Sequence, residues 1–313
     1  MSPRALVVLL AAFACLPASA QAAGSHQLGL YKVDRHIDVA GEGEVHEVSC
    51  KNGDIALDGM WRIDNVDQDL DYEPHPTPGF GTTGKAEWDI LESVLPERLE
   101  AAAPDTFEVE FFAVGGGDIQ GKLFVTCLPD PTPKAQGHAH GWTVGPLIAG
   151  APVAAALPET AAASASCPAG QLPIAPGFAW GGDSHGNVVR RWPAANGWDW
   201  RFLTDQAGGT VTVSHRCLTL RTNTAAGHRH TLKKRFTSDT LVVKRGLSTV
   251  EARCGEIYKG AIAAWDFGAF SNFDELWLLG HDPRPKIRAF KMLNADAVAR
   301  NAQFGLYCFK DRT

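Results

Sequence analysis

Several features that mark familiar protein classes are missing from this chain of 313 residues. Beyond residue 22, no segment reaches the roughly 18 consecutive apolar residues of a membrane-spanning helix, so the sequence predicts no transmembrane segment. Helical periodicity is scarce, and the best candidate is a short stretch at 96–103, PERLEAAA. The net charge is −6 and no basic patch stands out, which argues against nucleic acid as a partner.

Signatures of catalysis are also missing. The chain has no G-x-S-x-G, no H-E-x-x-H, no Walker loop and no Rossmann fingerprint. Ser184 and His185 are neighbours, and neighbours on a strand point apart, so they do not form a nucleophile–base pair. We therefore predict no catalytic residue and no enzyme, with a hydrolase of unrecognised type as the third hypothesis. The chain also lacks C-x-x-C, which argues against a zinc–thiolate site.

The first 22 residues have the three parts of a signal peptide. Arg4 gives a positive start, Ala5 to Leu16 form an apolar run, and Ala18-Ser19-Ala20 is a small-residue cleavage site. Cys15 would leave with this segment. The sequence therefore predicts an exported protein that is extracellular, at the cell surface or periplasmic.

The chain does contain a threefold repeat marked by cysteine. Each copy has an early cysteine (Cys50, Cys167, Cys254) and a late one (Cys127, Cys217, Cys308). Six cysteines allow 15 pairings, and an exported chain favours disulfides. One pairing gives every copy the same internal bridge: Cys50–Cys127, Cys167–Cys217 and Cys254–Cys308. Each bridge would add about 4 kcal/mol in the chain-entropy model.

The copies read as β-structure. Stretches such as LVVKRGLSTVEARC alternate and are rich in valine and threonine, as half-buried strands are. Each copy also ends in a pattern typical of a hairpin, for example GWDWRFLTD, QAGG and TVTVSHRCL. Trp61, Trp180 and Trp265 follow the early cysteines by 11, 13 and 11 residues and are expected in the core.

The predicted fold is all-β, with three tandem immunoglobulin-sized antiparallel β-sandwich-like domains. Each domain is closed by one intradomain disulfide. The signal peptide (1–22) is followed by domain 1 with a trailing linker (23–137), domain 2 (138–227) and domain 3 (228–313).

The middle copy resembles a small repeat found in secreted bacterial proteins. The residues that carry the resemblance are CPAGQLPIAPGFAWGG, then WPAANGWDWRFLTDQAGGTVTVSHRCL, from Cys167 to Leu218. The other copies keep the cysteines, the tryptophan and the proline but lose CPAG. The resemblance implies an extracytoplasmic, disulfide-closed β-domain and no assigned activity.

Paired histidines are the sharpest candidate site. His138 and His140 lie 11 and 13 residues beyond Cys127, and His228 and His230 lie at the same distances beyond Cys217. In an extended strand such pairs face the same way, and two imidazoles on one face can bind Zn or Cu. The alternative is a turn at the domain junction whose histidines form hydrogen bonds.

An acidic stretch offers a candidate calcium site. Asp67, Asp69 and Asp71 alternate as at the start of a calcium loop, but Tyr72 and Pro78 stand where an EF-hand needs Gly and Glu. An irregular calcium site and a solvated acidic loop remain as alternatives. No cofactor is predicted beyond these candidate Zn, Cu or Ca sites.

The first copy carries an insertion at about 66–85 that the other copies lack. Its prolines and glycines predict a long loop, and long loops on rigid β-scaffolds often carry function. The candidate partner-binding residues are Tyr72, His75, Phe80 and Trp88. The expected partner is a protein or glycan at a surface, or another copy of this chain; the alternative is a tolerated surface insertion.

Together these features favour a non-catalytic exported binding or surface-structural protein, adhesin-like or a subunit of an extracellular assembly. The alternative is a periplasmic metal-binding protein that uses the paired histidines.

Overall fold

The computed structural model describes residues 29–39, 43–64, 96–111, 119–135, 138–182, 184, 186–204, 207–268, 276–294, 296 and 298–312. In this part of the chain the secondary structure consists of antiparallel strands and one turn of 3₁₀ helix, η1 (Lys51–Gly53). The all-β prediction is confirmed. None of the described segments forms a helix long and apolar enough to cross a membrane.

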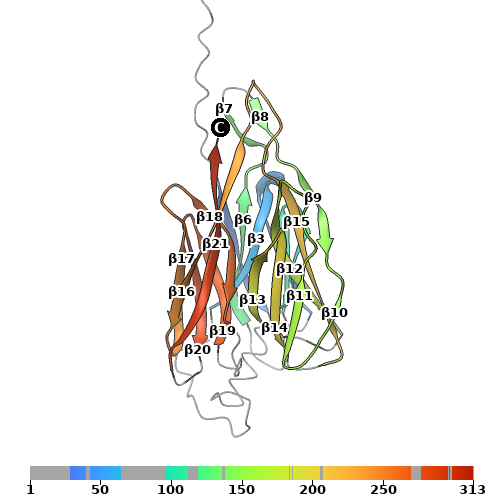
Figure 1. The fold of residues 1–313 in the computed structure, drawn as a ribbon, viewed down its shortest axis with the longest axis vertical. Helices are drawn as coiled ribbons and strands as arrows, with labels where there is room; N and C mark the ends of the chain where they lie inside the picture. The colour runs from blue at the N-terminus through green and yellow to red at the C-terminus, as the bar shows by residue number, and fades with distance from the viewer. Residues whose placement is uncertain are drawn as a thin grey trace, which may run out of the picture.

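Three large sheets make up the molecule, and we name each by the two copies that share it (Figure 1). The 3–1 sheet has the order β1 (Tyr31–Val39), β6 (Ile119–Leu128), β3 (Ile55–Ile63), β19 (Leu276–Arg284), β20 (Ile287–Asn294) and β17 (Gly246–Arg253). The 1–2 sheet has the order β10 (Val153–Ala154), β15 (Thr210–Thr219), β12 (Gln171–Gly181), β4 (Pro96–Ala103), β5 (Thr106–Phe111) and β2 (Val45–Ser49), with β9 (Val144–Ala149) also paired to β15. The 2–3 sheet has the order β11 (Glu159–Ala163), β14 (Gly197–Thr204), β13 (Gly186–Ala194), β18 (Lys259–Asp266), β21 (Arg300–Arg312) and β16 (Thr231–Val243).

A small hairpin stands apart from these sheets. It pairs β7 (Thr132–Ala135) with β8 (His138–His140). Figure 1 shows it at the same end of the molecule as the C-terminus.

The expectation of three separate tandem sandwiches is not confirmed, because every large sheet combines strands of two copies. Each copy forms half of one sheet, and its next strands form half of another. The halves join where Arg62 pairs with Gly280, Phe178 with Leu99, and Arg191 with Trp265. A half-sheet alone would leave an edge of unpaired backbone groups, and the neighbouring copy satisfies that edge. The three copies therefore form a closed ring of sheets.

The predicted closing hairpins are wrong for the same reason. In each copy the last two strands, β5 and β6, β14 and β15, or β20 and β21, enter different sheets. The tight hairpins are instead β4–β5, β13–β14 and β19–β20. The helix candidate at 96–103 is also wrong, because pairing with β5 and β12 makes this segment strand β4 despite its alanines.

Strands β3, β12, β18 and β19 at the junctions are buried on both faces over most of their length. Strand β3 reads IALDGMWRI and is buried at eight of nine positions, whereas β5, away from the junction, alternates strictly. Trp61 and Trp265 lie in the core as predicted, and Trp180 is half-buried. Gly280 has φ of +121°, and a Cβ there would lie 1.9 Å from the Trp61 carbonyl oxygen. Close approach of copies 3 and 1 therefore requires glycine.

The predicted disulfide pairing is confirmed in all three copies. In copy 1, Cys50 follows β2 in the 1–2 sheet, and its partner Cys127 lies on β6 in the 3–1 sheet. The early and late cysteines of the other two copies are likewise attached to different sheets. Each disulfide therefore ties two of the three sheets together within one copy. Three intrachain disulfides are consistent with an exported protein; residues 1–22 lie outside the described residues.

Candidate metal centre

A short turn presents two of the predicted histidines side by side. Ala225 and His228 exchange backbone hydrogen bonds of 3.0 and 3.1 Å around Ala226-Gly227. Both central residues have positive φ, +49° and +79°, as a type I′ turn requires. His230, two residues on from His228, is anchored where its backbone N–H donates to Thr222 Oγ1 at 2.9 Å. The AAGHRH sequence thus builds a tight hairpin that ends at strand β16.

Asn223 brings strand β8 onto this hairpin. Its side-chain oxygen accepts from the Gly141 N–H at 2.7 Å, and its own N–H donates to the Gly141 carbonyl at 3.1 Å. His140, next to Gly141, is thereby carried to His228 and His230 across more than 80 residues of sequence.

The rings of His140, His228 and His230 form one cluster, which we call the trihistidine centre. The ring centroids of His140 lie 4.6 Å from those of both other histidines. One ring nitrogen from each residue lies within 4.8 Å of those of the other two. His140 Nε2 and His228 Nε2 are 3.1 Å apart. His140 and His230 are almost fully buried, and His228 is half-buried.

Each ring has an acceptor on its Nδ1 atom. His140 Nδ1 lies 3.2 Å from the Asn223 carbonyl oxygen, and His228 Nδ1 lies 3.4 Å from that of Ala226. His230 Nδ1 lies 2.5 Å from Asp311 Oδ2, near the end of β21. A carboxylate or carbonyl oxygen can only accept, so each Nδ1 carries a hydrogen, and in a neutral ring of this tautomer Nε2 is the nitrogen that can bind a metal ion.

This arrangement brings the Nε2 atoms of His140 and His228 face to face. Two Nε2 lone pairs that face each other at 3.1 Å repel unless a proton or a cation lies between them. In a tetrahedral zinc site with Zn–N bonds of about 2.0–2.1 Å, two ligand nitrogens are about 3.3 Å apart. A histidine ligand also commonly donates its other N–H to a carboxylate or a carbonyl. The His140–His228 nitrogen pair therefore has a spacing close to that of two zinc ligands, and all three rings have outer hydrogen bonds of this kind.

The other predicted site residues have different outcomes. His138 lies on β8 opposite Ala135, but its side chain lies outside the described residues. The calcium candidates Asp67, Asp69 and Asp71 fall in 65–95, outside the part of the chain that the structure describes. The same holds for the partner-binding candidates Tyr72, His75, Phe80 and Trp88, so these remain predictions.

A second group of ligand-type atoms surrounds the middle disulfide. His215 lies within 4.8 Å of the sulfurs of Cys167 and Cys217, but these sulfurs are bonded to each other and are not thiolates. Both ring nitrogens of His215 are buried with no hydrogen-bond partner, and burial lowers the pKa of this imidazole to about 4. His215 is therefore a neutral core residue.

Buried ionisable side chains from all three copies meet in the core, and we call Asp58, Arg191, Arg288 and the neutral His281 the charged centre. Asp58 Oδ1 lies 3.0 Å from Arg191 Nη2, and Asp58 Oδ2 accepts from the Ala263 N–H at 2.9 Å. Arg288 Nη2 lies 3.8 Å from Asp58 Oδ2, and all four side chains are fully buried. Burial raises the pKa of Asp58, against the opposing effect of both arginines.

No protein-family model matches this chain, and no curated protein matches it in sequence. The resemblance of the middle copy to small secreted repeats stays a prediction. The functional argument therefore rests on the geometry of the trihistidine centre.

Proposed function

We propose that this chain is an exported, non-catalytic metal-binding protein whose trihistidine centre holds one divalent transition ion. The observation that carries the proposal is the convergence of three imidazoles, each with an acceptor on Nδ1. Neutral imidazole ligands suit Zn²⁺ and Cu²⁺ rather than Ca²⁺ or Mg²⁺, which prefer oxygen. The lack of catalytic motifs supports binding rather than catalysis.

The position of the centre supports a role beyond local structure. Its ligands come from the β7–β8 hairpin and from the turn before β16, and Asp311 comes from the end of β21. An ion there would link copies 2 and 3 at the end of the molecule where the C-terminus lies (Figure 1). With three protein ligands, a tetrahedral ion keeps a fourth position for water or another ligand.

The test is a metal titration of the mature, untagged protein after chelator treatment. Zn²⁺ and Cu²⁺ are added in competition with a chromophoric chelator, and the bound ion is counted. We expect one ion per chain, and at least 100-fold weaker binding in His140→Ala/His230→Ala. His36→Ala, which removes an exposed histidine on β1, is the matched control and should bind as wild type does. Equal binding by the double variant and wild type would refute the proposal.

Two further measurements make that result interpretable. Circular dichroism and a free-thiol assay check that the double variant keeps its strands and its three disulfides. His138→Ala tests whether this neighbour adds a ligand: weaker binding would make it the fourth, and unchanged binding would leave three.

The surface-binding hypothesis rests on residues 65–95, outside the described residues, and stays a prediction. Deletion of residues 67–84 should leave folding and metal binding intact and abolish binding to a surface partner.

A further inference from the structure

The three copies differ at one equivalent buried position. In the tight hairpins, the second strand begins its pairing next to the turn at Thr106, Gly197 or Ile287. The next residue on that strand is Phe107 in copy 1, Trp198 in copy 2 and Arg288 in copy 3. All three side chains are fully buried. Two copies therefore place a large aromatic ring here, and the third places a guanidinium.

The neighbouring copy in the same sheet also differs at one position, the residue before its late cysteine. This residue is Arg216 at the 1–2 junction, Tyr307 at the 2–3 junction and Thr126 at the 3–1 junction. At the 2–3 junction Trp198 and Tyr307 pack edge to face with centroids 5.8 Å apart. At the 3–1 junction Arg288 Nη2 donates to Thr126 Oγ1 at 2.7 Å. A polar pair at the 3–1 junction thus takes the place of the aromatic pair at the 2–3 junction.

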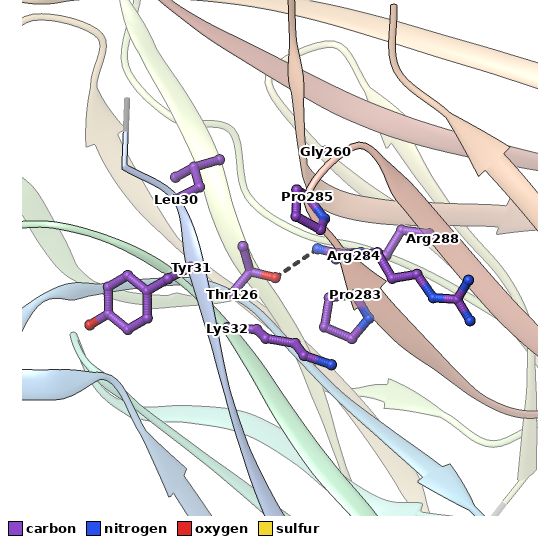
Figure 2. A pocket seen from close by; sticks show the side chains of 9 residues that line it. All are labelled: Leu30, Tyr31, Lys32, Thr126, Gly260, Pro283, Arg284, Pro285 and Arg288. Atoms are coloured by element: carbon purple, nitrogen blue, oxygen red, sulfur yellow. Dashed lines mark hydrogen bonds between the residues drawn. The ribbon is translucent and has the colours of Figure 1, made fainter. Parts of the chain in front are cut away.

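A cavity of about 190 Å³ lies at this junction. Figure 2 shows the hydrogen bond from Arg288 to Thr126 between Leu30 on one side and Pro283 and Pro285 on the other. For comparison, a dry apolar cavity of about 150 Å³ in another protein binds benzene. The space is therefore large enough for a small organic molecule with one ring.

The lining combines apolar walls with cations. Leu30, Pro283 and Pro285 give the apolar surface; Lys32 and Arg284 are exposed at the rim. The rim cations have carboxylate partners, Lys32 with Asp282 at 3.1 Å and Arg284 with Glu251 at 3.3 Å. The third cation of the lining, Arg288, lies deepest and is almost fully buried.

Arg288 lies among more cations than carboxylates: its Nη2 donates to the Ala261 carbonyl, and the second carboxylate near it, Asp282, already pairs with Lys32 and Arg62. In the charged centre two guanidiniums share one carboxylate, Asp58, and burial keeps His281 neutral by lowering its pKa well below its ordinary value. The Nε atom of Arg288 is buried and has no hydrogen-bond partner among the described residues. A carboxylate beside Arg288 would neutralise this excess charge, and guanidinium–carboxylate pairs are among the strong hydrogen-bonded pairs.

We propose that the cavity between copies 3 and 1 binds a small carboxylate with an apolar body, about the size of benzoate. The carboxylate pairs with Arg288, and the body packs on Leu30, Pro283 and Pro285. This site is independent of the trihistidine centre.

The first test uses the wild-type protein and a matched series of probes. Benzoate has both the ring and the charge, benzamide keeps the shape without the charge, and acetate keeps the charge without the ring. Dissociation constants are measured by NMR titration with and without chelator, since a carboxylate can also bind a metal ion. We expect one benzoate per chain, bound at least 10-fold tighter than benzamide or acetate in both conditions. Equal binding of benzoate and benzamide, or no binding of benzoate, would overturn the proposal.

A variant designed from the other junction gives the second test. Arg288→Trp with Thr126→Tyr recreates the aromatic pair of the 2–3 junction and leaves Asp58 with one arginine. Thermal unfolding checks that the variant folds, and it should lose benzoate binding by at least 10-fold. His140→Ala/His230→Ala should keep benzoate binding, so a failed metal proposal and a failed cavity proposal remain distinguishable.

Discussion

The charged centre and the trihistidine centre both gather polar groups from distant segments, but they differ in what completes them. In the charged centre, Asp58 is held by Arg191, by Arg288 and by the Ala263 N–H. The partners of the Asp58 carboxylate there all come from the protein itself. In the trihistidine centre, an oxygen acceptor orients each Nδ1–H, and one ring nitrogen of each histidine lies within 4.8 Å of those of the other two. In our proposal a metal ion from outside completes this second centre.

The comparison shows that burial alone does not mark a binding site. His215 and His281 are buried as deeply as His140, yet both lie among core residues and have lowered pKa values. What distinguishes the trihistidine centre is convergence of like atoms with oriented tautomers.

Removal of the carboxylate from the charged centre should have the largest effect. Asp58→Asn leaves two buried guanidiniums without a counter-charge, and breaking a buried ion pair in this way costs about 3–5 kcal/mol. We expect this loss in the free energy of unfolding measured with urea. Asp34→Asn, at the exposed pair with Lys122, is the control and should cost about 0–1 kcal/mol. Similar losses for the two variants would show that the charged centre has no special structural role.

Metal removal should destabilise the chain through the trihistidine centre. At a free zinc concentration 100 times Kd, a bound ion adds about 2.7 kcal/mol to the stability of the folded chain. The urea midpoint should therefore rise with zinc and fall with chelator. The midpoint of His140→Ala/His230→Ala should not respond, and an equal response would place the ion elsewhere.

Acid should destabilise the protein through the buried neutral histidines. His215 has a pKa of about 4 in the folded chain, against about 6.5 for an unfolded histidine. As pH falls below about 6.5 the unfolded chain takes up a proton first, so the stability from this group is full above that pH and is lost toward pH 4. By pH 5 the loss is about 2 kcal/mol. With chelator present throughout, unfolding of His215→Leu should depend less steeply on pH between 7 and 5; an unchanged slope would contradict the assignment.

The Asp311 carboxylate, which accepts from His230 Nδ1, should increase the affinity of the trihistidine centre for a metal ion. Asp311→Asn keeps an oxygen near Nδ1 but removes its charge, and changes of this kind weaken metal binding about 10- to 100-fold. Because the amide oxygen still accepts, we expect the low end, about tenfold, in the chelator competition assay. Asp239→Asn, at an exposed position of β16, should leave affinity unchanged. Equal metal affinity of the two variants would show that Asp311 does not contribute to metal binding.

Local sequence patterns predicted much of this structure and missed what depends on distant partners. Regular spacing identified the strands and the disulfide pairing. Sheet sharing was missed, because a strand such as β3 carries no local signal that its partner is β19 rather than a strand of its own copy. The segment at 96–103 became a strand through the same kind of pairing, against its helical composition.

The candidate site shows the same division. Periodicity identified the histidine pairs, but the centre combines His140 with both His228 and His230, and Asn223 makes that meeting. Asn223 and Asp311 were missed, since neither forms a motif with the histidines in sequence. Arg288 was also missed, although alignment of the three copies at the tight hairpins would have exposed it beside Phe107 and Trp198.

The most direct test of the central claim is a long-range ¹H–¹⁵N NMR spectrum of the histidine side chains during zinc titration. The account predicts that His140, His228 and His230 carry hydrogen on Nδ1, and that their Nε2 resonances shift together and saturate at one zinc per chain. The resonances of His215 and His281 should stay in place. Unmoved Nε2 resonances in the trihistidine centre at saturating zinc would contradict the account.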